Sequence, residues 1–103
     1  MDPIKLQKDL QEKINKKDWQ EVILLCNKLL EFQPENHGLY ITKGSAYMGI
    51  QNYREAAKAY QVLLDVNFTD GENDEWKDRL KLCHQILDVD GNFFYLSKTI
   101  IVK

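Results

Sequence analysis

The sequence has few residues that interrupt a helix and none of the long apolar runs that mark membrane proteins. Two prolines and five glycines among 103 residues leave room for long helices. The longest apolar runs, 22–25 and 93–96, are far shorter than the roughly 20 residues of a membrane span. The N-terminus carries no apolar signal stretch. We therefore expect no membrane association and a cytoplasmic location.

Cysteine is also scarce. Cys26 and Cys83 form no disulfide framework, and they lack the close-pair spacing of a metal site. Two unpaired, buried thiols are the expected state, and a disulfide between them is the alternative. No metal ion or other cofactor is expected.

An excess of positive charge is missing as well. The formal net charge is −2, whereas nucleic-acid binding requires clustered Lys and Arg to neutralise phosphates. We therefore expect no nucleic-acid partner. With 44% hydrophobic and 29% charged residues, the composition is that of a folded globular domain.

The chain repeats itself with a period of 34 residues. When it is shifted by that amount, Asp18-Trp19 falls on Asn52-Tyr53, and residues 29–31 (Leu-Leu-Glu) fall on residues 63–65 (Leu-Leu-Asp). Similar residues keep this register across 18–31, which makes a chance match improbable. Such a period is typical of stacked structural repeats.

Apolar residues recur at helical spacing in five segments, 4–14, 19–31, 39–48, 53–66 and 73–87. Asp18 and Asn52 stand immediately before two of these segments and are good N-cap residues. The connections are short, as expected of antiparallel neighbours. The sequence therefore predicts an all-α protein in which helices A and B alternate and a final A helix follows.

The second repeat resembles a tetratricopeptide repeat. Tyr40, Gly44, Tyr47, Ala56 and Tyr60 match the aromatic, small, aromatic, Ala and aromatic positions of that family at the correct spacing. The resemblance implies about two and a half repeats stacked as a short right-handed superhelix over residues 1–90, followed by an apolar tail at 91–103.

This sequence departs from the family pattern at several places. Lys43 stands where Leu is usual, and Phe68 stands where Pro is usual. The first repeat matches mainly in its second helix, and its first helix is apparently one residue shorter at Lys16-Lys17. The last helix follows a two-residue insertion. The residues expected to pack the repeats together are Trp19, Val22, Cys26, Tyr40, Gly44, Tyr47, Ala56, Tyr60, Trp76, Leu80 and Cys83.

The patterns that suggest chemistry are weak. Asp88, Asp90 and Asn92 open like a calcium loop, but the turn glycine and the bidentate Glu of such a loop are missing. The adjacent Cys83 and His84 point about 100° apart on a helix and cannot form a nucleophile–base pair. Because His37 follows a proline turn, it is expected to be solvated. We expect no enzyme activity.

The resemblance implies a scaffold that binds a peptide or a helix of a partner protein in the groove lined by its A helices. The best-known version grips the C-terminal carboxylate of a heat-shock chaperone with Lys, Arg and Asn. Those clamp positions fall here near Gln7 and Gln11 and at Thr42, Asp74 and Asp78, and none of them matches. Such a ligand is therefore disfavoured. The expected groove residues are Gln7, Gln11, Ile41, Thr42, Ser45, Met48, Lys77, Lys81 and His84.

The tail suggests an alternative function. Residues 93–102 are aromatic and β-branched, with Lys98 as their one charged side chain, and they read as a strand that has no partner strand. The tail folds back on the repeats, or pairs with another chain, or belongs to a longer protein. In the second case the chain is a structural or oligomerisation subunit that associates through its tail and last helix.

Overall fold

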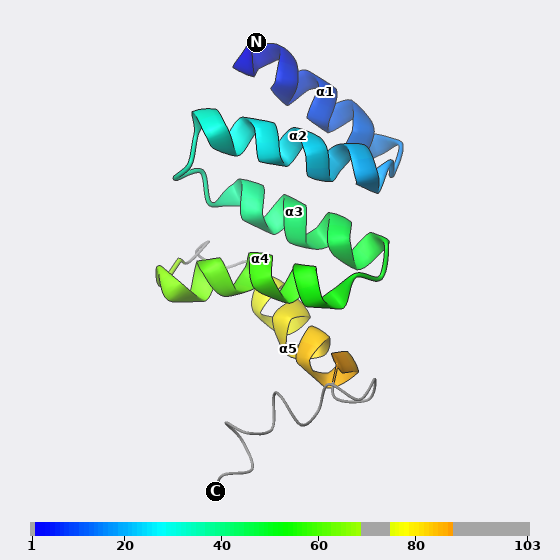
Figure 1. Cartoon of the computed structure of the whole chain (residues 1–103), viewed down its shortest axis with the longest axis vertical. Coiled ribbons are helices and arrows are strands. Elements are labelled where there is room, and N and C mark those ends of the chain that lie inside the picture. The colour runs from blue at the N-terminus through cyan, green and yellow to red at the C-terminus, as the bar shows by residue number, and fades with distance from the viewer. Residues whose placement is uncertain (1, 69–74, 88–103) are drawn as a thin grey trace, which may run out of the picture.

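The computed structural model describes residues 2–68 and 75–87, and these residues form five α-helices (Figure 1). The helices are α1 (Pro3–Asn15), α2 (Trp19–Phe32), α3 (Gly38–Gly49), α4 (Tyr53–Asp65) and α5 (Glu75–Leu87). The all-α prediction is confirmed, and each helix starts and ends within two residues of its predicted bounds. Their lengths of 12 to 14 residues are ordinary for globular proteins.

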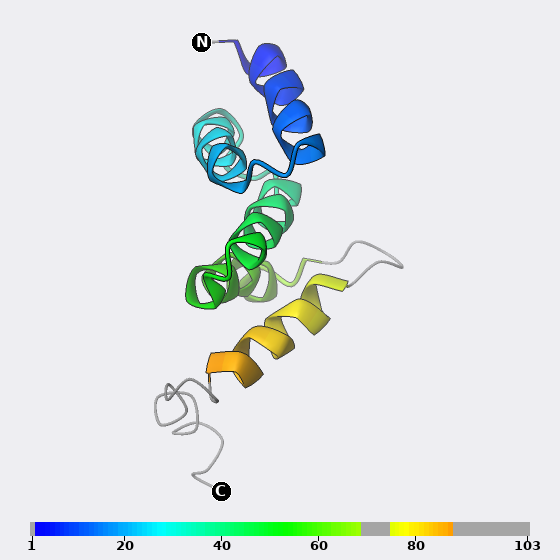
Figure 2. The same ribbon diagram turned by 90° about the vertical axis from the view of Figure 1, so that its right-hand side faces the viewer.

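The helices are stacked in chain order, and each packs antiparallel against the next (Figure 1). Turning the molecule by 90° shows that α2 is displaced sideways from α1, and that α3 and α5 run in the same direction (Figure 2). The chain thus zigzags between two layers. None of the helices in the two described segments is long and apolar enough to cross a membrane.

Two of the described helices begin with a side-chain cap. Asp2 caps α1 by accepting a hydrogen bond from the Ile4 backbone N–H at 3.0 Å, and Pro3 occupies the first turn. Asn52 caps α4 in the same way through the Glu55 N–H at 3.3 Å, as predicted. Asp18 occupies the N-cap position of α2, as predicted, but its side chain makes no capping hydrogen bond, and neither does that of His37 before α3.

The α1–α2 and α3–α4 turns have the same backbone conformation. Lys17 and Gln51, which are 34 positions apart, have positive φ angles of 58° and 62°. The next backbone N–H in each turn, of Asp18 and of Asn52, bonds back to the carbonyl five residues earlier. Because both turns keep one register, α1 is not shortened before its turn, contrary to the expectation from sequence.

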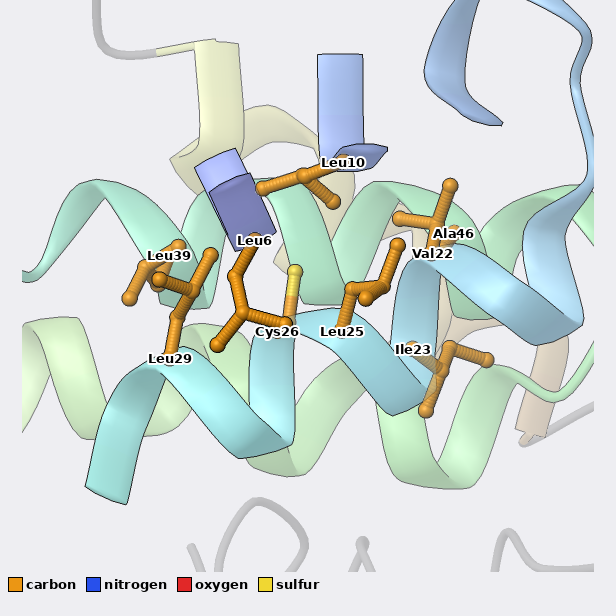
Figure 3. Close-up of a cluster of buried hydrophobic side chains, with 9 residues drawn as sticks. All are labelled: Leu6, Leu10, Val22, Ile23, Leu25, Cys26, Leu29, Leu39 and Ala46. Carbon is orange, nitrogen blue, oxygen red and sulfur yellow. The ribbon is translucent and has the colours of Figure 1, made fainter. Parts of the chain in front are cut away.

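The buried side chains form two clusters along the stack. The first is shared by α1, α2 and α3 and consists of Leu6, Leu10, Val22, Ile23, Leu25, Cys26, Leu29, Leu39 and Ala46 (Figure 3). The second lies on α4 and α5 and consists of Ala56, Ala57, Tyr60, Leu63, Trp76, Leu80 and Cys83. Both cysteines are buried and free, as predicted.

Several predictions concern residues that are not described. The tail at 91–103, with its capacity for self-association, and the calcium-like residues Asp88, Asp90 and Asn92 lie outside the described residues, as does Asp74 of the clamp comparison.

Candidate binding face

The eleven residues expected to pack the repeats are all buried or half-buried. Trp19, Tyr40 and Tyr47 are half-buried against the two clusters. Helices α3 and α4 approach closely at Gly44, where an added Cβ would lie 2.5 Å from the ring of Tyr60. No side chain larger than a hydrogen atom fits there without moving this fully buried ring. Gly49 meets the indole of Trp19 in the same way.

A polar cluster joins α3, α4 and α5 beside that contact. The Tyr60 hydroxyl lies 3.3 Å from Ser45 Oγ, and Arg79 Nη1 donates to the same Oγ at 3.1 Å. Arg79 Nη2 also pairs with Glu75 at 3.6 Å. Burial raises the pKa of Tyr60, and the hydrogen bonds from Ser45 and Arg79 oppose that shift. The phenol therefore stays protonated and links the core to the surface.

A second contact between α3 and α5 lies one helical turn further along. The Cys83 thiol donates to the Met48 sulfur with an S···S distance of 3.4 Å. Burial raises the pKa of Cys83, and it raises the pKa of Cys26 to about 11. Because the thiolate is the reactive form, the raised pKa values lower the reactivity of both thiols at neutral pH.

The predicted groove residues of α1 and α3 differ in their exposure and in the contacts that they already make within the chain. Gln7 and Gln11 are exposed on one side of α1, and Gln11 donates to Asn15 at 3.1 Å. The Thr42 hydroxyl donates to the Gly38 carbonyl at 3.2 Å. Ile41 packs against the second core cluster. Two of these side chains, Gln11 and Thr42, thus already donate hydrogen bonds within the chain.

The α5 residue that contacts Ser45 of α3 is Arg79, which is not one of the predicted groove residues. Since successive helical residues are rotated by about 100°, Lys77, Lys81 and His84 lie roughly 140–160° around the axis from Arg79. Leu82 follows Arg79 by three residues and is 43% exposed. Sequence reasoning did not select Arg79. The available signal was the 34-residue spacing of Ser45 and Arg79, which equals the period seen in the sequence.

His37 is not the solvated loop residue expected from its neighbours. It is half-buried and lies edge-on to Phe68, with the ring centroids 5.5 Å apart. Phe68 in turn lies 6.4 Å from the ring of Trp76, over which Lys77 places its ammonium group. Phe68, which stands where the tetratricopeptide pattern has Pro, thus contacts the rings of His37 and Trp76.

No group of three or more metal-ligating side chains occurs within residues 2–68 and 75–87. Comparison of the chain with protein-family models, with curated proteins and with solved structures found no match. We define the binding face as a set of exposed and half-buried residues of α1, α3 and α5 that includes the Ser45–Arg79 contact. Its members are Gln7, Gln11, Thr42, Ser45, Met48, Arg79 and Leu82.

Proposed function

We propose that this chain is a non-catalytic adaptor of the tetratricopeptide type, whose binding face holds a peptide or a helix of a partner protein. The observation that carries the proposal is the 34-residue register shared by sequence and helices: α2 begins at Trp19 and α4 at Tyr53, each after a turn of the same conformation. The turn at Asn67, after α4, has this conformation too, so the spacing and not the turn type supports a repeat. Period and geometry together favour two copies of one helical hairpin, each of which buries its apolar side against the next.

The binding face has the chemistry of a surface that recognises a largely uncharged segment. Its members on α1 and α3 are amides, hydroxyls and a thioether, with no charged side chain among them. On α5, Arg79 is paired with Glu75, and the exposed Leu82 offers an apolar contact. Affinity for such a ligand depends on shape and hydrogen bonds, and it therefore changes little with salt concentration.

Affinity capture with two matched variants tests the proposal. Gln7→Arg/Gln11→Arg places two charges on the α1 part of the binding face. Gln20→Arg/Asn27→Arg places two charges on exposed amide positions of α2. The native chain and the α2 variant are expected to retain the same partner, and the α1 variant is expected to lose it.

Equal retention by both variants would contradict the proposal. Equal loss by both, together with a multimeric mass of the native chain in solution, would favour the alternative role as a structural subunit. Circular dichroism of each variant checks that the helices are intact, so a folding defect is not mistaken for a binding defect.

A further inference from the structure

The seam between α3 and α5, defined as Ser45, Met48, Arg79 and Cys83, holds two helices together through two adjacent side-chain contacts. Arg79 Nη1 donates to Ser45 Oγ at 3.1 Å, and Cys83 Sγ donates to Met48 Sδ at 3.4 Å. Arg79 and Cys83 are one turn apart on α5, as are Ser45 and Met48 on α3. The two helices run in the same direction here (Figure 2). Both contacts therefore join the same pair of helices, and separation of the helices breaks both.

The helix on the far side of this seam is the last one described. Trp76, Leu80 and Cys83 hold α5 against α4. The seam adds contacts with α3 to those that α5 makes with α4. Segments held by few contacts open at a lower free energy than densely packed ones. The position of α5 beside α3 is thus sensitive to small changes at the seam.

Met48 is the oxidisable group of the seam. Its thioether is half-buried, it packs against the second core cluster, and it accepts the Cys83 hydrogen bond. Since burial raises the pKa of Cys83, that neighbour stays a thiol and reacts slowly. Thioether oxidation needs no ionisation, so a peroxide reacts at Met48 in preference to Cys83.

We propose that the seam is a redox-sensitive switch, in which oxidation of Met48 by a peroxide releases α5 from α3. The peroxide transfers one oxygen atom to Met48 Sδ: its O–O bond breaks, an S–O bond forms, and water leaves. Two electrons pass from sulfur to the peroxide. The product sulfoxide is polar, and its oxygen occupies the space between Met48 and Cys83.

The release follows from the loss of packing. A sulfoxide oxygen placed against the second cluster needs water or a hydrogen-bond donor, and separation of α5 admits water to it. The Arg79–Ser45 contact, one turn away, breaks in the same movement. The consequence that partner binding weakens rests on the proposed function, but the release of α5 does not.

Hydrogen exchange of the full chain, followed by mass spectrometry without any partner, tests the switch. Hydrogen peroxide is applied until Met48 carries one oxygen atom. The amides of 75–87 are expected to exchange about tenfold faster or more, while those of 19–32 keep their rates. A methionine sulfoxide reductase is expected to restore the original rates. Unchanged exchange of 75–87 in chains oxidised at Met48 would overturn the proposal.

Two variants separate the switch from general oxidative damage. Met48→Leu conserves volume and cannot be oxidised, so peroxide is expected to leave its α5 exchange unchanged, although Met1 still reacts. An equal response of this variant and the native chain would overturn the proposal. Met48→Gln places a polar group at the seam and is expected to show fast α5 exchange without any oxidant.

Discussion

The two core clusters differ in the kinds of side chain that hold the helices together. The first is almost wholly aliphatic: Val22, Cys26 and Leu29 are completely buried, and no ring lies among its fully buried members. The second places the large rings of Tyr60 and Trp76 among alanines and beside Gly44. Aliphatic clusters adjust when volume is conserved, whereas a ring against a glycine leaves no such freedom.

The second cluster also carries polar atoms that the first lacks. The Tyr60 hydroxyl is hydrogen-bonded to Ser45, and the buried Trp76 Nε1 has no hydrogen-bond partner in the described part of the chain. The hydrogen bond of the Tyr60 hydroxyl favours one arrangement of helices over others, because a shifted arrangement would leave this hydroxyl without its partner. The difference teaches that the first cluster mainly supplies stability, while the second also defines how α5 is placed beside α3.

The largest expected effect comes from the ring–glycine contact. Gly44→Leu forces a branched side chain into the Tyr60 ring and is expected to lower the free energy of unfolding by about 3 kcal/mol. Urea denaturation measures this. Gly38→Leu is the matched control, because its Cβ would lie 3.4 Å from the nearest atom, an ordinary contact. If the two variants unfold alike, the packing of α4 on α3 is not as described.

Much of this architecture could be predicted from sequence, because apolar stripes at helical spacing determine helix type and burial. The buried positions Val22, Cys26 and Tyr60 were predicted from the stripe and the 34-residue register alone. Whether the side chain of Asp18 makes a capping bond could not be predicted from its residue type. Asp18 (φ −85°, ψ 77°) and Asn52 (φ −94°, ψ 77°) have nearly the same backbone angles, yet only the Asn52 side chain makes the bond.

The candidate site follows from the sequence less directly than the fold does, and α5 shows why. The register assigned to this helix depends on an insertion before it, and a shift of one residue rotates a helical face by about 100°. The choice of Lys77, Lys81 and His84 for the groove stays a prediction, whereas the α5 contact with Ser45 of α3 comes from Arg79. The buried residues Trp76, Leu80 and Cys83 are insensitive to such a shift, because they form the apolar stripe itself.

The first cluster is expected to contribute less to the free energy of unfolding at alkaline pH. Burial raises the pKa of Cys26 from 9.0 to about 11, so the unfolded chain loses this proton at lower pH than the folded chain does. Stability is complete below pH 9 and falls as the pH rises from 9 to 11, by about 2–3 kcal/mol for a shift of this size.

Unfolding free energies of the native chain and of Cys26→Ala, measured between pH 8 and pH 11, check this expectation. The variant is less stable at every pH because it leaves a cavity, but its profile should be flatter than that of the native chain. Tyrosines ionise in both proteins, so the difference between the two slopes isolates Cys26. Parallel profiles would show that the thiol does not contribute.

A smaller effect tests the polar atoms of the second cluster. Tyr60→Phe keeps the ring against Gly44 and removes only the hydroxyl that contacts Ser45, which costs about 1 kcal/mol of unfolding free energy. Tyr40→Phe, a half-buried tyrosine packed on the same cluster, is the control and should change stability by less than about 0.5 kcal/mol. An unchanged Tyr60→Phe would mean that the hydroxyl does not help to place α5.

The smallest expected signal is that of an acidic peptide from a chaperone C-terminus, which should not bind appreciably. A carboxylate would need positively charged donors on the binding face, but Gln7 and Gln11 are neutral amides, Thr42 donates to Gly38, and Arg79 is paired with Glu75. Isothermal titration at low salt measures the affinity. A dissociation constant near 10 μM, about −7 kcal/mol, would overturn the prediction. Glu75→Gln, which frees the guanidinium, should raise the affinity if Arg79 is the group held back.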